Sequence, residues 1–209
     1  MIGSKRKILV ATTNPGKVAE LRAMLDIDID VELVGLSDFE GIGEVEEDGQ
    51  TFAENARKKA TSYAIATGLW TIADDSGLVI DALDGAPGVK SARFSGKKEN
   101  DRTLLDHKNM ARVLKLLDGV PAEKRTCRFM CCLCLTSPVE VLIETQGKLE
   151  GVITENQIGT NGFGYDPIFF VPNLNKTVAQ LTPEEKNAIS HRANAVRKLK
   201  PLLAKLMSA

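Results

Sequence analysis

Two adjacent aspartates, Asp74 and Asp75, follow the apolar run "LWTIA" at residues 69–73. The run predicts a buried strand, so both carboxylates come where that strand ends inside a core. A buried carboxylate costs free energy unless a cation or hydrogen-bond donors compensate its charge. For Asp75 we therefore favour a functional role over a solvated turn. Mg²⁺, which takes one or two carboxylates together with phosphate oxygens, fits such a site.

More acids lie in the glycine-punctuated loop "GIGEVEEDG", residues 41–49. Together with Asp75 they could complete a site for a hard cation. The alternative is a set of solvated turn acids, and we favour that role for Glu44 and Asp48.

The segment "ATTNPGK", residues 11–17, could bind an anion. A strand runs into a turn that opens a helix, and the free backbone N–H groups at a helix start attract negative charge. Thr12, Thr13 and Asn14 add side-chain donors, and Lys17 adds a mobile positive charge. The Walker A pattern is absent, and an ordinary capped helix with a surface lysine explains these residues about equally well.

Two later segments could contact a nucleotide. In "GTNGFGYDP", residues 159–167, glycines flank Phe163, so its ring could stack on a base, although it could also lie in the core. An extended segment would put Phe163 and Tyr165 on one side. The segment "EEKNAISHR", residues 184–192, supplies the donors Lys186, His191 and Arg192. A Ser190–His191 hydrolase dyad has little support, since no G-x-S-x-G elbow is present.

The four cysteines crowd into "CRFMCCLCL", residues 127–135, where Cys131 would point to the opposite face of a strand from Cys132 and Cys134. This spacing favours buried thiols that act as small apolar side chains over a metal or redox cluster.

The remaining pattern predicts the elements that must position these residues. A capping box at Thr51 and another at Thr182 mark two helix starts, and Pro201 is expected to interrupt or kink the last helix. The result is an α/β protein with a mixed sheet. We expect strands over 7–13, 31–36, 69–73, 78–83, 127–137, 140–151 and 168–171, and helices over 15–25, 52–67, 101–118 and from 183 onward.

Composition excludes some partners. The chain has 209 residues and a formal net charge of -1, so we expect no general electrostatic binding to nucleic acid or to an anionic membrane. No signal peptide and no membrane-spanning stretch is evident, and we expect a cytoplasmic protein.

Taken together, "ATTNPGK", "EDGQTFAENARKKA", "ADDSGLVIDALDGAPGVKSARFSG", "GFGYDPIFF" and "LTPEEKNAISHR" resemble the inosine triphosphate pyrophosphatase family. The resemblance implies an elongated mixed β-sheet flanked by helices, forming a single domain over 1–209 with two lobes and a central substrate cleft. It implies a Mg²⁺-dependent homodimer that hydrolyses ITP, dITP and XTP to the monophosphate and pyrophosphate. A related pyrophosphatase for pyrimidine or modified nucleoside triphosphates is the alternative.

The resemblance also implies residue roles. Asp75 corresponds to the catalytic base and a metal ligand, and Glu46 to the other metal ligand, although Glu47 is its neighbour. One departure is Asn161, where glycine is more usual; we expect its tolerance of left-handed backbone angles to accommodate it. The residues that correspond to substrate contacts are Thr12, Thr13, Asn14, Pro15, Gly16, Lys17, Ser76, Phe163, Gly164, Tyr165, Asp166, Lys186, His191 and Arg192.

Overall fold

The structure is a computed structural model that describes residues 5–25, 31–96 and 99–208. The chain divides into two units, which are described separately. Unit 1 comprises Met1–Asp75, Cys131–Gly147 and Arg192–Ala209, and unit 2 comprises Ser76–Met130 and Lys148–His191.

The strands of the described residues form a seven-stranded sheet in the order β2-β1-β3-β4-β5-β6-β7. Strand β1 runs parallel to β2 and β3, whereas β6 is antiparallel to β5 and β7, so the predicted mixed sheet is confirmed. The strands are β1 (Arg6–Ala11), β2 (Val31–Gly35), β3 (Trp70–Ile80), β4 (Thr126–Thr136), β5 (Val141–Ile153), β6 (Phe169–Val171) and β7 (Lys176–Thr177).

Capping residues set several helix ends. Thr51 accepts a hydrogen bond from the Glu54 backbone, and Gly68 ends the same helix with a left-handed φ of 72°. Thr182 and Glu185 form the predicted capping box, followed by Pro183 in the first turn. The helices are α1 (Pro15–Leu25), α2 (Phe52–Thr67), α3 (Arg102–Leu116), α4 (Pro183–Ile189) and α5 (His191–Met207). None of them, in the part of the chain described, is long and apolar enough to cross a membrane.

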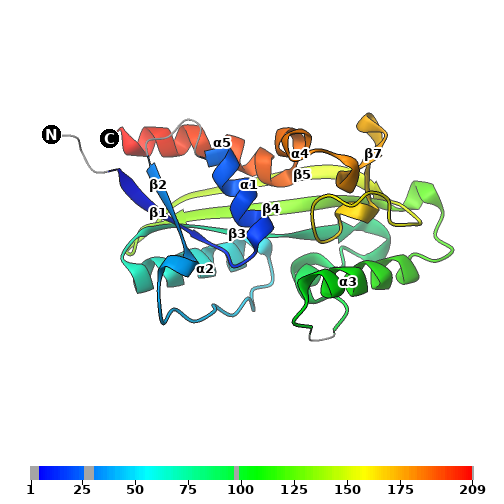
Figure 1. Cartoon of the computed structure of the whole chain (residues 1–209), viewed down its shortest axis with the longest axis horizontal. Helices are drawn as coiled ribbons and strands as arrows, with labels where there is room; N and C mark the ends of the chain where they lie inside the picture. Colours follow the sequence, from blue (N-terminus) through cyan, green and yellow to red (C-terminus); the bar gives the residue numbers. More distant parts are fainter. Residues whose placement is uncertain (1–4, 26–30, 97–98, 209) are drawn as a thin grey trace. The chain divides into compact units, whose positions relative to one another are not determined.

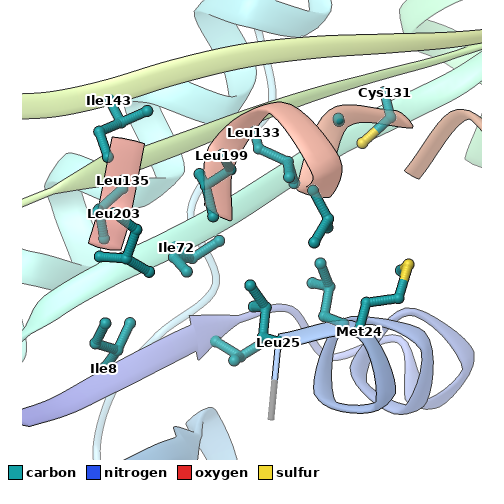
Figure 2. Close-up of a cluster of buried hydrophobic side chains, with 14 of the residues drawn as sticks. Ile8, Met24, Leu25, Ile72, Cys131, Leu133, Leu135, Ile143, Leu199 and Leu203 are labelled. Carbon is teal, nitrogen blue, oxygen red and sulfur yellow. The ribbon is translucent and has the colours of Figure 1, made fainter. Parts of the chain in front are cut away.

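Alternation along β1 divides the core of unit 1 between two sheet faces. Ile8 and Val10 belong to a cluster with side chains of α1 and α5, whereas Leu9 and Ala11 belong to a cluster with α2. Figure 1 shows α5 and α2 on opposite sides of β1 and β3. In Figure 2, labelled side chains from α1, α5, β1, β4 and β5 lie around Ile72 of β3.

Unit 2 has a core of its own. Helix α3 contributes Met110 and Val113, which lie in one cluster with Leu78 and Ile80 of β3 and with Phe169 of β6. Phe129 stacks on Phe169 with ring centroids 4.2 Å apart. This core anchors the segment that carries the predicted nucleoside loop.

Strand β3 differs from the prediction. We expected two strands, over 69–73 and 78–83, with Asp74 and Asp75 between them. The structure has one continuous strand, Trp70–Ile80, that passes through both aspartates, and Asp81–Leu83 forms a 3₁₀ turn. The sequence pattern is misleading here because charged side chains inside a strand read as its end.

The C-terminal helix is not interrupted at Pro201, and a kink there stays a prediction. Its break lies at Ser190, whose ψ of 159° separates α4 from α5, and α5 continues through Pro201. Pro201 is exposed, so the hydrogen bond that its ring removes is lost on the side facing water. The four cysteines are buried and free, as predicted.

This position gives a stability test. Replacing Pro201 by alanine restores a backbone donor inside α5 and removes the ring clash, so the free energy of unfolding should rise by about 1–3 kcal/mol. Urea denaturation would measure it. The matched control is Pro183→Ala at the start of α4, where proline suits the helix and no gain is expected. A loss of stability for Pro201→Ala would contradict this account.

Candidate functional site

The side chains of the two adjacent aspartates point to opposite faces of the sheet. Ile72 lies in the cluster with α1 and α5, and Ala73 lies in the cluster with α2. Because side chains alternate along a strand, Asp74 follows Ile72 to the first face and Asp75 follows Ala73 to the second. The strand thereby delivers one carboxylate to each layer of helices.

Asp74 is the centre of a buried ionic cluster in unit 1. Its side chain is 0% exposed and accepts hydrogen bonds from the Lys17 ammonium, from Arg192 Nε at 3.0 Å and from the Cys131 thiol at 3.0 Å. Arg192 also pairs through Nη1 with Glu20 of α1. Burial alone would raise the pKa of Asp74, but Arg192 and Lys17 outweigh it and hold the pKa well below its ordinary value. Asp74 is therefore a permanently ionised counter-ion and a poor proton acceptor.

Asp75 has the opposite electrostatics. Burial raises its pKa to about 6, Lys59 opposes this shift, and Glu47 adds to it. The Lys59 ammonium lies 3.8 Å from Asp75 Oδ1, 2.5 Å from Glu47 Oε1 and 2.6 Å from the Asp74 carbonyl oxygen. Burial would lower the pKa of Lys59, but Asp75 and Glu47 raise it above its ordinary value. Lys59 therefore stays charged between two carboxylates.

The loop that carries Glu47 is held on both sides of that residue. The Val45 N–H donates to the Tyr63 hydroxyl at 3.2 Å, and the Gly49 N–H donates to Asn55 Oδ1 at 2.8 Å. A Cβ at position 49 would lie 2.7 Å from Asn55 Oδ1, so only glycine fits there without displacement. The neighbouring Glu46, which the sequence analysis assigned to the metal, is exposed, whereas Glu47 is half-buried.

The acids of this site suit a hard cation. Glu47 and Asp75 already surround one positive charge, and carboxylate oxygens are the ligands that Mg²⁺ prefers. Among the described residues no group of three or more His, Cys, Asp or Glu side chains forms a metal site. Two carboxylates are nevertheless enough for Mg²⁺ when phosphate oxygens and waters complete its shell.

The turn at residues 12–17 differs from the predicted cradle of free amides. The N–H groups of Gly16 and Lys17 donate to Asn14 Oδ1 at 3.0 and 3.3 Å, and Asn14 N–H donates to Thr12 Oγ1. Asn14 therefore caps α1 as predicted, and in doing so it occupies the amides expected to be free. Lys17 is likewise held by Asp74 and is not a mobile surface charge.

A cavity of about 750 Å³ adjoins this turn within unit 1. This volume lies in the range of ligand pockets. Of the predicted substrate residues, Thr12, Thr13 and Pro15 line it. The other lining residues are Val18, Ala19, Arg22, Gly35, Leu36, Ser37, Ile42, Glu44 and Tyr63.

In unit 2 the loop around Phe163 is fixed by charge. Asp166 accepts the Phe163 N–H at 2.9 Å and the Lys186 ammonium at 2.6 Å. The same ammonium lies 4.4 Å from the centre of the half-buried Phe163 ring. A Cβ at Gly162 would lie 2.0 Å from the Asp166 carboxylate, so this loop requires glycine there. The structure thus brings Phe163, Asp166 and Lys186 together.

Other predicted residues take different positions. Tyr165 does not share a patch with Phe163, because its ring lies in the core and its hydroxyl donates to the Ser91 carbonyl at 2.7 Å. His191 is buried and stacks on Phe129 at 4.9 Å. Ser76 is half-buried in β3. Asn161 keeps a negative φ, and its side chain instead donates to the Leu181 carbonyl at 3.0 Å.

Sequence reasoning missed Lys59, Asn55 and Glu20. The first two are four residues apart on α2, on a buried stripe that also holds Ala56 and Ala60. A polar residue on an otherwise apolar helical stripe was the available signal. Glu20 gives no such signal, since its partner Arg192 is distant in sequence.

Comparisons with known proteins extend over nearly the whole chain. A model of the Ham1 family matches residues 8–202. The dITP/XTP pyrophosphatase of Listeria monocytogenes serotype 4b is 48% identical over 201 residues, which cover 96% of each protein. The dITP/XTP pyrophosphatase of Geobacter sulfurreducens is 50% identical over 93% of this chain and 94% of its own. The structure of a HAM1 protein from Coxiella burnetii aligns with a TM-score of 0.85 and 39% identity, covering 96% of this chain and 99% of that one.

The raised pKa of Asp75 makes stability depend on pH. Its ordinary value is 3.8, and in the folded protein it is about 6, so the folded state binds the proton more tightly. Above about pH 6 the ionised group then destabilises the fold by up to about 3 kcal/mol, and below pH 4 this cost is absent. In EDTA, Asp75→Asn should therefore be more stable than the parent at pH 8, with a gain that shrinks towards pH 4.

Urea denaturation at several pH values would measure this difference. The exposed Glu46→Gln variant is the control and should follow the parent at every pH. An Asp75→Asn variant less stable than the parent at pH 8 would show that Asp75 stabilises the fold through Lys59.

Proposed function

Because this chain belongs to the Ham1 family, we propose that it hydrolyses ITP, dITP and XTP to the monophosphate and pyrophosphate, removing them from the nucleotide pool. Relatives named dITP/XTP pyrophosphatase, 48% identical over 96% of each chain, support this function. The observation that carries it is Asp75, a buried carboxylate with a pKa of about 6 beside a second acid and a lysine.

Asp75 is the proposed general base of the reaction. A base works best when its pKa lies near the working pH, and the pKa of about 6 that Asp75 has without a bound metal ion meets that condition. Asp74 does not meet it, since Arg192 and Lys17 keep its pKa well below the ordinary value. Asp75 would orient the water that attacks the α-phosphorus or take its proton, with pyrophosphate as the leaving group. Asp74 would hold Lys17 and Arg192 in place.

Glu47 and Asp75 would hold the Mg²⁺ ion, which when bound would neutralise charge on the phosphate oxygens and on the leaving pyrophosphate. Glu47 is preferred to the predicted Glu46 because it already shares the Lys59 cation with Asp75. The Lys59 ammonium has three N–H donors, so it could turn to a phosphate oxygen when another cation takes its place between the acids.

The turn at residues 12–17 would bind the phosphate tail through side chains. The hydroxyls of Thr12 and Thr13 and the amide nitrogen of Asn14 are the available donors, since the helix-start amides already bind Asn14 Oδ1. The Lys17 ammonium has three N–H groups, and one that does not bind Asp74 would donate to a phosphate oxygen. Contacts from Pro15, Gly16 and Ser76 stay predictions.

In unit 2, the Phe163 ring would stack on the purine, and Lys186 would donate towards its 6-oxygen. A donor at that place favours hypoxanthine and xanthine over adenine, whose amino group cannot accept it. The buried His191 is a second candidate donor. Contacts from Gly164, Tyr165, Asp166 and Arg192 stay predictions, as do the homodimer, the cytoplasmic location and the single two-lobed domain.

A substrate panel tests this function. With Mg²⁺, kcat/KM for ITP, dITP and XTP should exceed that for ATP, GTP and the pyrimidine triphosphates by at least about 100-fold. Pyrophosphate and orthophosphate should be assayed separately, and pyrophosphate should be the direct product. Orthophosphate as the first product, or a preference for pyrimidine triphosphates, would replace the proposal with a phosphatase or with the related pyrimidine enzyme.

A pair of neighbouring variants tests the metal site. Glu47→Gln removes a proposed ligand and should lower kcat/KM for ITP by at least about 100-fold, because charge neutralisation in the transition state is lost. Glu46→Gln changes an exposed side chain and should retain activity within about threefold of the parent. The opposite ranking would return the metal to Glu46. Asp75→Asn should abolish turnover in the same assay.

A further inference from the structure

The loop from Asn161 to Asp166 is fixed by side chains outside it as well as within it. Asn161 donates its backbone N–H to the Ala179 carbonyl at 3.0 Å and its side-chain amide to the Leu181 carbonyl at 3.0 Å. On its other side the loop is held by α3, through a residue that none of the assignments above uses. That residue is Asp106.

Asp106 binds a backbone amide next to Phe163. Its Oδ2 accepts the Gly164 N–H at 2.8 Å, and its Oδ1 lies 3.4 Å from Arg102 Nε, one turn earlier on α3. Asp106 is buried, with 8% of its surface exposed. Arg102 therefore orients a carboxylate that is withdrawn from water, and the second oxygen faces the loop.

The result is a pair of carboxylates on successive amides. Asp166 accepts the N–H of Phe163, and Asp106 accepts the N–H of Gly164, so both peptide groups that flank the aromatic residue are fixed. Gly164 has a φ of +64°, a backbone state that glycine readily leaves for others. A charge-assisted hydrogen bond to this amide holds the backbone in that state and with it the direction of the ring.

We propose that Asp106 is a positioning residue for the purine-binding loop, acting through the Gly164 amide; this inference rests on the proposed role of Phe163. Asp106 does not touch the substrate. It lowers the conformational freedom that the loop would otherwise lose when a nucleotide binds, and such preorganisation acts on affinity. Its loss therefore weakens nucleotide binding and leaves the phosphate chemistry nearly unchanged.

Substitutions at position 106 separate this role from a merely structural one. Asp106→Ala removes the acceptor, and the KM for ITP should rise about tenfold while kcat stays within about twofold, as expected for the loss of one such hydrogen bond. Asp106→Asn keeps an oxygen for the Gly164 N–H and should restore most of the affinity. Asp106→Ser, whose hydroxyl is too short to reach the amide, replaces the alanine variant if that protein does not fold.

The structural control is Asp101→Ala on the same helix. Asp101 caps α3 by accepting the N–H groups of Thr103 and Leu104, so its loss should cost about 1 kcal/mol of stability. The loop contact of Asp106 is intact in this variant, and its KM should equal that of the parent. An equal rise in KM for Asp101→Ala and Asp106→Ala would reduce Asp106 to a residue that merely stabilises α3.

Hydrogen exchange gives a readout that needs no substrate. The Gly164 amide should exchange about tenfold faster in Asp106→Ala than in the parent, and at nearly the parental rate in Asp106→Asn. Unchanged protection in Asp106→Ala would overturn the inference.

The Phe163→Ala variant distinguishes failure of the inference on Asp106 from failure of the proposed purine contact of Phe163. If Phe163→Ala raises the KM for ITP and Asp106→Ala does not, the inference on Asp106 fails while the proposed function stands. If Phe163→Ala leaves the KM unchanged, the loop does not bind the purine, and both the assignment of Phe163 and the inference built on it fail.

Discussion

The site depends on the burial of charge in the middle of a β-strand. Asp74 lies in the interior of unit 1, where an isolated ionised carboxylate would cost several kcal/mol. Lys17, Arg192 and the Cys131 thiol compensate it, and Arg192 in turn needs Glu20. One buried charge thus dictates the positions of side chains from α1, β4 and α5. Removing any one of these side chains takes away one of the compensating contacts of a buried charge.

The neighbouring position shows how alternation along a strand gives two identical side chains opposite chemistry. Asp74 meets two cations on its face of the sheet and stays a strong acid. Asp75 meets one cation and a second acid on the other face, and burial raises its pKa into a range useful for proton transfer. A shift of the strand by one residue would exchange these environments. The fold therefore gives the two carboxylates opposite electrostatic environments.

Much of this could be predicted from the sequence because the signals are local. The starts of α1, α2 and α4 follow from Asn14, Thr51 and Thr182, and the mixed sheet follows from the order of apolar runs. The prediction for Asp75 rested on a local signal too, because an acid that follows an apolar run is costly to bury, and its role in the reaction stays a prediction. The predictions that were wrong concerned features that depend on partners remote in sequence. Strand β3 continues through both acids because Lys17 of α1 and Arg192 of α5 neutralise Asp74 and Lys59 of α2 lies beside Asp75, and no local pattern records these partners.

The same limit applies to the break at Ser190 and to Cys131. Pro201 was the residue expected to break the helix, but a proline on an exposed helix face is tolerated. The break lies instead at Ser190, whose backbone is extended. The cysteines behave as small apolar groups, as their spacing indicated, except that Cys131 also donates to Asp74. Its proton stays in place because burial, followed by the charge of Asp74, raises the pKa of the thiol.

The position of the Lys59 ammonium has a consequence for how the proposed ion would arrive. Glu47 and Asp75 already share the charge of Lys59, so a metal ion that binds both carboxylates would compete with this ammonium for their oxygens. The affinity for the metal ion measured by titration would then reflect the difference between its binding and that of the Lys59 ammonium to the same carboxylate oxygens. The Lys59 ammonium would then be able to donate to an anion bound with that ion.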